Sequence, residues 1–375
     1  MKETYEGNRR IRYAVIGLGN IAQVAILPAF EHAKQNSELV ALISSNREKL
    51  TVLAKKYEIE HTGSYDSVES VLRTSRADAV YIALPNTMHR SMTERVAAVG
   101  VHVLCEKPMA MTVEDCEAMV AATRAENVKL MVAYRLHFEK ANLTAIERIR
   151  KGEIGDPRIF TSTFCQQVRE GDVRTRGRTA GGAAYDMGVH CINAARNLFR
   201  EEPTQVLAVQ VRDTGDRFQE VDEATTAILR FSSGRVAQFT ASQGAADVAE
   251  YRVVGTKGDI RLDPAYGYRS ALSEYVTVGE KTYHTSYSSR DQFAPELIHF
   301  SNAILTDTEP EPSGEEGLCD VRVLRAIEAS ARTGQRVNLA PYEREDDRPR
   351  PSLRLDMRLP AVGNVRPVDA PSPSK

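Results

Sequence analysis

The chain has 375 residues, more than one ordinary domain needs, and this length predicts two domains. An apolar fraction of 42% can fill two cores, and a formal net charge of −2 gives no electrostatic reason to expect nucleic acid as a partner. No apolar run is long enough for a bilayer and the charged N-terminus lacks the apolar segment of a secretory signal, so we expect no membrane partner and a cytoplasmic location.

The first third of the chain alternates short β-branched runs with amphipathic stretches. It predicts helices from residue 21 onward and at 47–57, 89–99 and 113–126. This alternation is typical of an α/β Rossmann domain with a parallel sheet and helices on both faces, which we assign to residues 1–134. The predicted strands are 13–16, 39–44, 79–84, 101–105 and 129–133.

The pattern changes beyond residue 151, where long strand candidates follow one another with turns between them. These strands are 157–166, 205–211, 224–231 and 235–242. Helices are predicted at 183–199 and 317–333, and we expect the second to pack back on the first domain. Residues 135–340 are therefore expected to form a substrate-binding and oligomerisation domain of the α+β class with an open, mostly antiparallel sheet. Residues 341–375 are charged and proline-rich, which predicts a tail that wraps a partner subunit or stays mobile.

The segment Gly17-Leu18-Gly19-Asn20-Ile21-Ala22 follows the first predicted strand and opens a helix. Gly17 permits the tight turn, Gly19 lets the backbone approach a pyrophosphate, and the small Ala22 keeps the helix close to the strand. In this position the segment predicts a dinucleotide site that includes Gly17, Gly19, Asn20 and Ile21. The alternative is a plain turn between a strand and a helix.

The end of the second predicted strand lacks the acidic residue with which NAD binders usually hold the ribose hydroxyls. It reads Ser44-Ser45-Asn46-Arg47-Glu48-Lys49 instead. A carboxylate at that site would repel a 2′-phosphate, whereas hydroxyls with Arg47 and Lys49 would bind it. We therefore expect NADP, with NAD as the alternative, and place Ser44, Asn46, Arg47 and Lys49 at its phosphate. In the other interpretation, Arg47 and Lys49 lie on a solvated helix.

Lys107, followed by Pro108, lies just past the strand 101–105, at the carboxyl edge where sheets of this class bind ligands. Pro108 restricts the backbone of Lys107. A lysine beside a nicotinamide can hydrogen-bond a substrate hydroxyl, or donate to the alkoxide that develops as hydride leaves. We therefore predict a catalytic role for Lys107, with an exposed loop lysine as the alternative.

Asp186 and His190 are four residues apart on the predicted helix 183–199, so both are expected on one face. Asp186 would then fix the tautomer and position of the imidazole, and neutral His190 would accept a proton from a carbinol. Both residues are therefore candidate catalytic residues. An ordinary contact within a helix is the alternative.

Two arginines are candidate substrate-binding residues. Arg135 and His137 follow the strand at 129–133, and Arg174 lies in a polar loop before the Asp186 helix. Each arginine could hold substrate hydroxyls or form an ion pair between the domains, and both kinds of role stay open for His137. Histidines and carboxylates do not cluster at ligand spacing, so no metal is expected. The five cysteines include no Cys-x-x-Cys pair and are expected to be reduced, buried thiols.

Several motifs, in a fixed order and spacing, carry a resemblance to a known family. They are the glycine turn, Ala-Leu-Pro-Asn-Thr-Met-His at 83–89, Cys-Glu-Lys-Pro-Met-Ala at 105–110, Ala-Tyr-Arg-Leu-His at 133–137 and Asp-Met-Gly-Val-His at 186–190. With them the chain resembles the Gfo/Idh/MocA oxidoreductase family from about residue 9 to residue 338, and within that family the glucose–fructose oxidoreductases and aldose dehydrogenases.

The resemblance implies a Rossmann domain joined to an open sheet that covers the nicotinamide and often packs against another subunit. We therefore expect a homo-oligomer, either a dimer or a tetramer. The resemblance also implies that Lys107 lies beside the reacting centre. Ser44 and Lys49 match the positions that hold the adenosine phosphate in members that use NADP.

The resemblance further implies that the segment with Leu84, Asn86 and His89 lies near the nicotinamide half of the cofactor, and that Glu106 lies near its ribose. One departure concerns the reaction itself. Glucose–fructose oxidoreductases carry a tyrosine where this chain has His190, and histidine is the common residue in ordinary dehydrogenases of the family.

The expected activity is NADP-dependent transfer of hydride between the nicotinamide and a sugar or polyol, through oxidation of an aldose at C1 to a lactone or the reverse. His190 would remove the hydroxyl proton with help from Lys107. Loops at 169–182 and 245–251 are expected to recognise the hydroxyl stereochemistry. The alternatives are a sugar–sugar oxidoreductase that never releases its NADP, and a non-catalytic dinucleotide sensor.

Overall fold

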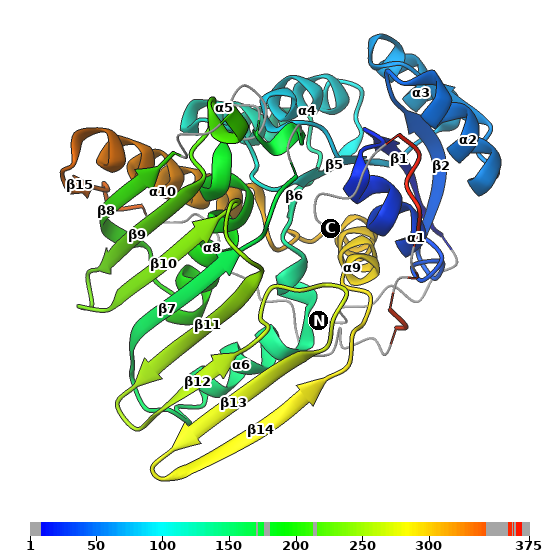
Figure 1. Cartoon of the computed structure of the whole chain (residues 1–375). Helices are drawn as coiled ribbons and strands as arrows, with labels where there is room; N and C mark the ends of the chain where they lie inside the picture. Colours follow the sequence, from blue (N-terminus) through cyan, green and yellow to red (C-terminus); the bar gives the residue numbers. More distant parts are fainter. Residues whose placement is uncertain are drawn as a thin grey trace.

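Six strands at the start of the chain form one parallel sheet in the order β3-β2-β1-β4-β5-β6 (Figure 1). The computed structural model describes residues 9–169, 172–175, 181–212, 216–342, 359–361, 363 and 365–369. The strands are β1 Ile11–Ile16, β2 Ser37–Ile43, β3 His61–Gly63, β4 Ala79–Ile82, β5 His102–Glu106 and β6 Leu130–Ala133. The direction of sheet growth reverses between β1 and β4, and sheets of this kind bind ligands at that point, outside the carboxyl ends of the strands.

Helices cover both faces of this sheet because both faces of its strands are apolar. Along β1, Ala14 and Ile16 enter one core while Tyr13 and Val15 enter the other. The helices of this region are the π-helical η1 Ala22–Ile26, which follows the glycine turn and continues into α1 Leu27–Ala29, and α2 Arg47–Tyr57, α3 Val68–Ser75, α4 His89–Ala97 and α5 Val113–Ala125. Within the described ranges, no helix is both long enough and apolar enough to cross a membrane.

The second sheet has nine strands in the order β14-β13-β12-β11-β7-β10-β9-β8-β15, and it is antiparallel except where β10 pairs with β7. Helices α6 Lys140–Arg150 and α8 Val189–Phe199 pack on one face of it. The strands are β7 Pro157–Cys165, β8 Pro203–Val211, β9 Ala224–Phe231, β10 Val236–Ser242, β11 Val248–Gly255, β12 Gly258–Leu262, β13 Leu272–Val278, β14 Lys281–Tyr287 and β15 Val337–Asn338.

Two late helices return to the first domain. The helix α9 Phe293–Thr306 packs against β1 and β2, and α10 Gly314–Thr333 packs against α5 and β6 as well as against β8. The prediction that the last long helix packs back on the first domain is therefore confirmed. Both helices connect the two sheets, and the division of the chain at residues 134 and 340 stays a prediction.

The predicted fold class is confirmed, with a Rossmann sheet followed by an open, mostly antiparallel sheet. The sequence predicted none of the helices α3, α6 and α9, nor the strand β3 and the strands β11 to β15. In β13 and β14, polar and charged residues obscure the alternation of a strand, and most of β14 is exposed. The expectation of a loop at 245–251 is wrong for its second half, because β11 begins at Val248 and pairs with β7. In the other expected loop, at 169–182, residues 170–171 and 176–180 lie outside the described residues.

The described residues of the tail lie against the first domain. Leu359 packs on the core that α9 shares with β1, and the carbonyl oxygen of Pro360 accepts the N–H of Asp291 at 3.2 Å. The red segment 365–369 in Figure 1 lies beside α1 and β2. The described part of the tail therefore contacts the first domain of its own chain, an arrangement that neither expectation for residues 341–375 included; wrapping of a partner subunit stays a prediction.

Candidate active site

The glycine turn after β1 lies close to the next strand of the sheet. Gly17 has a φ of 95°, and a Cβ at this position would lie 2.3 Å from the carbonyl oxygen of Ala83, so the turn requires glycine. A Cβ on Gly19 would meet nothing within 4 Å, which leaves space in front of the helix that Asn20 and Ile21 begin. A helix N-terminus with open space before it fits a pyrophosphate.

Three of the four residues predicted at the adenosine phosphate meet at the carboxyl end of β2. The buried hydroxyl of Ser44 accepts the N–H of Asn46 at 3.2 Å, and the side-chain oxygen of Asn46 accepts the N–H of Lys49 at 3.0 Å, which caps α2. The side chain of Lys49 is only 15% exposed, whereas Arg47 is exposed on the first turn of α2. A hydroxyl, an amide and an ammonium at one edge fit a phosphate group.

His89 joins the loop after β4 to the loop after β5. Its Nε2 lies 2.9 Å from the carbonyl oxygen of Leu84, and its Nδ1 lies 3.1 Å from that of Pro108 and 3.2 Å from that of Met109. The ring is fully buried, and burial lowers the pKa of His89. His89 thus fixes the two loops to each other. Asn86 lies in the first of these loops, on the short turn η3 (Asn86–Met88), and its contact with a nicotinamide stays a prediction.

Glu106, at the end of β5, fixes the start of the lysine loop. Its Oε2 accepts the N–H of Lys107 at 3.1 Å, and its Oε1 accepts the hydroxyl of buried Tyr81 at 2.8 Å. Burial raises the pKa of Glu106, although Lys107 and Tyr81 act in the opposite direction. The carboxyl group is held at the carboxyl edge of the sheet, where a ribose hydroxyl could donate to it, and that contact stays a prediction.

The Lys107 amine meets the second domain at η6 (Ala184–Gly188), a π-helical turn that precedes α8. Its Nζ donates to the main-chain oxygen of Asp186 at 2.8 Å and lies 3.3 Å from Oδ1 of the same residue. The other carboxylate oxygen of Asp186 accepts from Arg174 at 3.1 Å and from Gln243 at 3.3 Å. Burial opposes the ionisation of Asp186, but the two cations outweigh it and hold the pKa of Asp186 below its ordinary value. Asp186 is therefore a carboxylate that positions Lys107.

The structure differs from the expectation that Asp186 orients His190. The Asp186 carboxylate is drawn to Lys107 and Arg174, whose charges attract it more strongly than a neutral ring can, and it makes no hydrogen bond with the imidazole. Asp186 acts on His190 through charge alone.

Several groups hold His190 in its neutral form. Burial lowers the pKa of His190, and the nearby cations Lys107 and Arg135 lower it further, while Asp186 raises it. The ring centroid lies 5.9 Å from that of Phe164 and 6.4 Å from that of Tyr266. A neutral imidazole in this setting can accept a proton at neutral pH.

Three buried polar atoms in this region have no hydrogen-bond partner within the described part of the chain: Nδ1 of His190, Nη2 of Arg174 and Oε1 of Gln243. Buried polar atoms are nearly always satisfied, so these atoms point to a polar ligand. Oε1 of Gln243 is an acceptor, Nδ1 of His190 is an acceptor when it carries no proton, and Nη2 of Arg174 is a donor. Hydroxyl groups of a polyol can both donate and accept, so they match this set. Sequence reasoning missed Gln243, whose only signal is its position directly after the predicted strand 235–242.

The described contacts of the Arg135 side chain are with other residues of the protein. Its two terminal nitrogens donate to Oε1 of Gln292 at 2.6 Å and to the carbonyl oxygen of Tyr266 at 2.5 Å. Its guanidinium also lies 5.1 Å from the ring centroid of Tyr268. Arg135 thus positions the segment whose Tyr266 ring lies beside His190, and its direct contact with a substrate stays a prediction.

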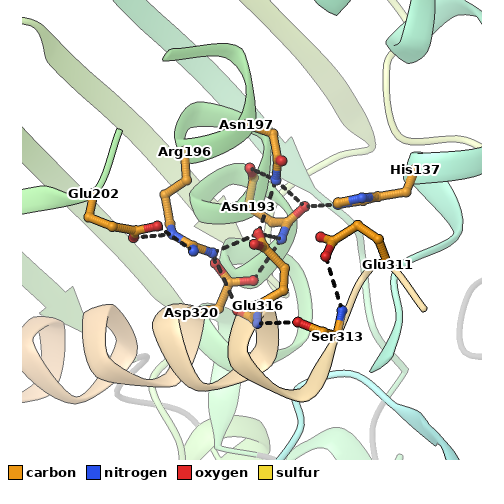
Figure 2. Close-up of polar contacts among 9 residues, drawn as sticks. All are labelled: His137, Asn193, Arg196, Asn197, Glu202, Glu311, Ser313, Glu316 and Asp320. Atoms are coloured by element: carbon orange, nitrogen blue, oxygen red, sulfur yellow. Dashed lines mark hydrogen bonds and ion pairs between the residues drawn. The ribbon is translucent and has the colours of Figure 1, made fainter. Parts of the chain in front are cut away.

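Figure 2 shows the buried network that holds His137, on η4 (Arg135–Phe138), against α8 and α10. Nε2 of His137 lies 2.8 Å from Oδ1 of Asn193, and Nδ2 of Asn193 donates to Glu316 at 2.9 Å and to Asp320 at 2.8 Å. Fully buried Arg196 pairs with the same two carboxylates. The described contact of His137 is a hydrogen bond to a neutral amide, which is neither of the two roles left open for it, so both roles stay predictions. Because α8 also carries His190, this network fixes the helix of the site.

Among the described residues, no group of three or more His, Cys, Asp or Glu side chains is placed to hold a metal ion. All five cysteines are free and buried, as expected for reduced thiols. The polar groups of the site are instead a lysine amine, a neutral imidazole and the amide and guanidinium around Asp186. Such groups can bind a hydroxyl, donate to its oxygen and accept its proton.

Family models match both halves of the chain. Residues 11–134 match the oxidoreductase family with an NAD-binding Rossmann fold, and residues 142–261 match the GFO/IDH/MocA C-terminal domain. The chain is similar to the D-xylose 1-dehydrogenase [NADP(+)] of Haloarcula marismortui, at 32% identity over 337 residues that cover 88% of this chain and 93% of that protein.

Solved structures show the same likeness. The aldose-aldose oxidoreductase from Caulobacter crescentus, complexed with glycerol, superposes with a TM-score of 0.84 at 37% identity, over 88% of this chain and 100% of that chain. A 3-ketoreductase from Actinomadura kijaniata, in complex with NADP and TDP-benzene, has a TM-score of 0.79 at 25% identity, over 86% and 98% of the two chains. These matches span both sheets and the site between them, and the chain therefore belongs to the Gfo/Idh/MocA family of oxidoreductases.

Proposed function

We propose that this protein is an NADP-dependent oxidoreductase that transfers hydride between the nicotinamide and C1 of an aldose, with a lactone as the oxidised product. The observation that carries the proposal is the contact of Lys107 with Asp186, which brings a basic amine of the first domain to the helix of His190. The names of the relatives support the two reactants. One is an NADP-dependent xylose dehydrogenase, and another is an aldose-aldose oxidoreductase with a bound polyol.

The residues around the glycine turn and at the strand ends fit NADP. The open space at Gly19 suits the pyrophosphate, and the donors at the end of β2 suit the 2′-phosphate. When bound, NADP supplies the acceptor of the hydride. The residues we assign to it are Gly17, Gly19, Asn20, Ile21, Ser44, Asn46, Arg47, Lys49, Leu84, Asn86, His89 and Glu106.

In the oxidising direction, His190 accepts the proton of the C1 hydroxyl, since its imidazole is held neutral. Lys107 donates a hydrogen bond to the same oxygen and stabilises the negative charge that develops there. Asp186 positions Lys107, and the free donor of Arg174 and the free acceptor of Gln243 bind other hydroxyls of the sugar. The hydride leaves C1 as the carbon–oxygen bond gains double-bond character.

A second candidate is a sugar–sugar oxidoreductase, in which the same site oxidises one aldose and then reduces a second carbonyl without releasing NADP. The similarity to an aldose-aldose oxidoreductase at 37% identity favours it. Four of the similar proteins are named as dehydrogenases, a reductase and an oxidoreductase, and no feature of the described residues favours a non-catalytic sensor.

The experiment is turnover with xylose or glucose carrying deuterium at C1. The proposal expects deuterium to appear in the reduced nicotinamide when free NADP and one aldose are supplied. Deuterium that appears only in a reduced sugar, with a nicotinamide absorbance that persists through dialysis, favours the sugar–sugar enzyme. Deuterium that stays on C1 contradicts both.

We also propose that the protein forms a homo-oligomer, a dimer or a tetramer, through the face of the nine-stranded sheet that its helices leave bare. Large apolar side chains alternate with buried ones along these strands and are exposed on that face. They include Ile159, Leu207, Val209, Val211 and Ile228. Light scattering should give a dimer or tetramer for the native chain and a smaller species for Val209→Asp, whereas a monomeric native chain contradicts the proposal.

A further inference from the structure

The C-terminal segment 365–369 is fixed to the helix that follows the glycine turn (Figure 1). The N–H of Val368 donates to Oε1 of Gln23 at 2.7 Å, and Nε2 of Gln23 donates to the carbonyl oxygen of Val368 at 2.9 Å. Gln23 is only 1% exposed, and the same Nε2 donates to the carbonyl oxygen of Leu18 within the turn. A buried amide of the nucleotide-binding helix thus holds the main chain of the tail at one point.

The next residue brings a carboxylate to the end of β2. Oδ2 of Asp369 accepts from Nδ2 of Asn46 at 2.9 Å and lies 4.0 Å from Nζ of Lys49. Asn46 and Lys49 are two of the residues that we assign to the adenosine 2′-phosphate. An anion of this chain therefore contacts the side chains that are assigned to an anion of the cofactor.

We propose that Asp369 is a specificity-determining residue of the cofactor site, which competes with the 2′-phosphate of NADP and is compatible with NAD. The inference rests on the proposed function, because it takes Asn46 and Lys49 to be the phosphate-binding residues. A carboxylate and a phosphate that share the donors of Asn46 and Lys49 lie close enough to repel each other. A ribose 2′-hydroxyl, in contrast, can donate a hydrogen bond to a carboxylate. Asp369 supplies from the C-terminus the acidic group that the end of β2 lacks.

The size of the effect follows from the exposure of the pair. The side chain of Asp369 is 61% exposed, and exposed ion pairs are weak and are screened by salt. We therefore expect the carboxylate to weaken NADP binding about two- to fivefold at low ionic strength, and less at 1 M salt. The segment has to move aside when the 2′-phosphate binds, since both anions need the same donors.

The test is the ratio of the dissociation constants for NADPH and NADH, measured on the full chain by the fluorescence of the reduced nicotinamide. Asp369→Asn removes the charge and keeps the shape, and asparagine adopts the left-handed backbone of this position, where φ is 41°. Asp307→Asn is the matched control, because Asp307 is also exposed, also has a positive φ and pairs with Lys129 away from the nucleotide site.

We expect Asp369→Asn to tighten NADPH about two- to fivefold without tightening NADH, and Asp307→Asn to change neither. In addition, NADP should accelerate hydrogen exchange at the amide of Val368, and NAD should not. An unchanged ratio, or weaker NADPH binding in Asp369→Asn, would overturn the proposal; the second result would mean that the tail holds the cofactor in place.

Lys49→Ala separates this inference from the function on which it rests. If Lys49→Ala leaves the NADPH to NADH ratio unchanged, the assignment of the phosphate site is wrong and the inference fails with it. If Lys49→Ala lowers the preference for NADPH while Asp369→Asn does not raise it, the phosphate site stands and only the role of the tail is wrong.

Discussion

The amine of Lys107 and the main chain of Asp186 form a hydrogen bond of 2.8 Å between the two domains. The lysine comes from the end of a parallel strand, and the aspartate comes from the turn before α8. Since His190 is the second residue of α8, this one contact sets where an amine and an imidazole lie relative to each other. The chemistry of the site therefore depends on how the second sheet sits against the first.

The activity of the enzyme should have an acid limb that lies below pH 6.5. The proposed base is neutral His190, and burial together with Lys107 and Arg135 lowers its pKa from the ordinary value of about 6.5. The rate is therefore retained at pH 6.5 and falls only as the pH drops through the lowered pKa. Asp186→Asn removes the charge that raises this pKa, so its limb should lie at a still lower pH. The profile of kcat/KM against pH measures both, and a limb above pH 7 contradicts the assignment of His190.

Gln243→Met should impair sugar binding and leave NADP binding unchanged. The amide of Gln243 donates to the Asp186 carboxylate, and its free oxygen is assigned to a sugar hydroxyl. The hydrogen bond lost to the sugar hydroxyl joins two neutral groups and is worth about 0.5–1.5 kcal/mol, or about two- to tenfold in kcat/KM for the aldose. Gln205→Met, which removes an exposed amide bonded to Asn338, is the control. If Gln243→Met and Gln205→Met have the same kcat/KM for the aldose, Gln243 does not bind the sugar.

Gly19→Ala should separate cofactor binding from stability. A Cβ at Gly19 meets no protein atom within 4 Å, so the free energy of unfolding without cofactor should change by less than about 0.5 kcal/mol. The same methyl group stands where the backbone is expected to approach the pyrophosphate, so the dissociation constant of NADP should rise at least about tenfold. Thermal unfolding and nicotinamide fluorescence give the two numbers. Unchanged NADP affinity would place the pyrophosphate elsewhere.

The network in Figure 2 should be costly to break from one side. Arg196→Met leaves the carboxylates of Glu316 and Asp320 buried without their cation, and such a loss costs about 3–5 kcal/mol of stability. The control Arg325→Met removes an arginine that is 48% exposed from its pair with Glu328, and should cost less than about 1 kcal/mol. Chemical denaturation measures the free energy of unfolding of both variants. A loss in Arg196→Met that is as small as the loss in Arg325→Met would show that the network contributes little to stability.

The sequence predicted the nucleotide half well because its signals are local. The glycine turn, the alternation of strands and helices and the cap before Arg47–Tyr57 each lie within a few residues of the structure they specify. Lys107 was identifiable for the same reason, since it directly follows a strand whose carboxyl end must face the ligand edge.

The rest of the site depends on contacts between distant segments. Gln243 reaches Asp186 only because β10 pairs with β7 and β9, a register that no local pattern reveals. The helical spacing of Asp186 and His190 suggested a hydrogen bond between them. In the structure the Asp186 carboxylate forms ion pairs with Lys107 and Arg174 instead. The contact of Asp369 with Asn46 joins residues 323 apart, which composition alone could not suggest for a proline-rich tail.

The most direct test of the account is a double-mutant cycle on the hydride-transfer step, measured in single turnover with C1-deuterated aldose for Lys107→Met, His190→Phe and the double variant. Lys129→Met serves as the control, because that lysine is equally enclosed and pairs with Asp307 and Glu309 far from the site. If the amine and the imidazole act on one hydroxyl, each single variant should lose about 10²–10⁴-fold and the double variant little more than the worse single. Losses that multiply, or a single variant that keeps the native rate, would contradict a shared site.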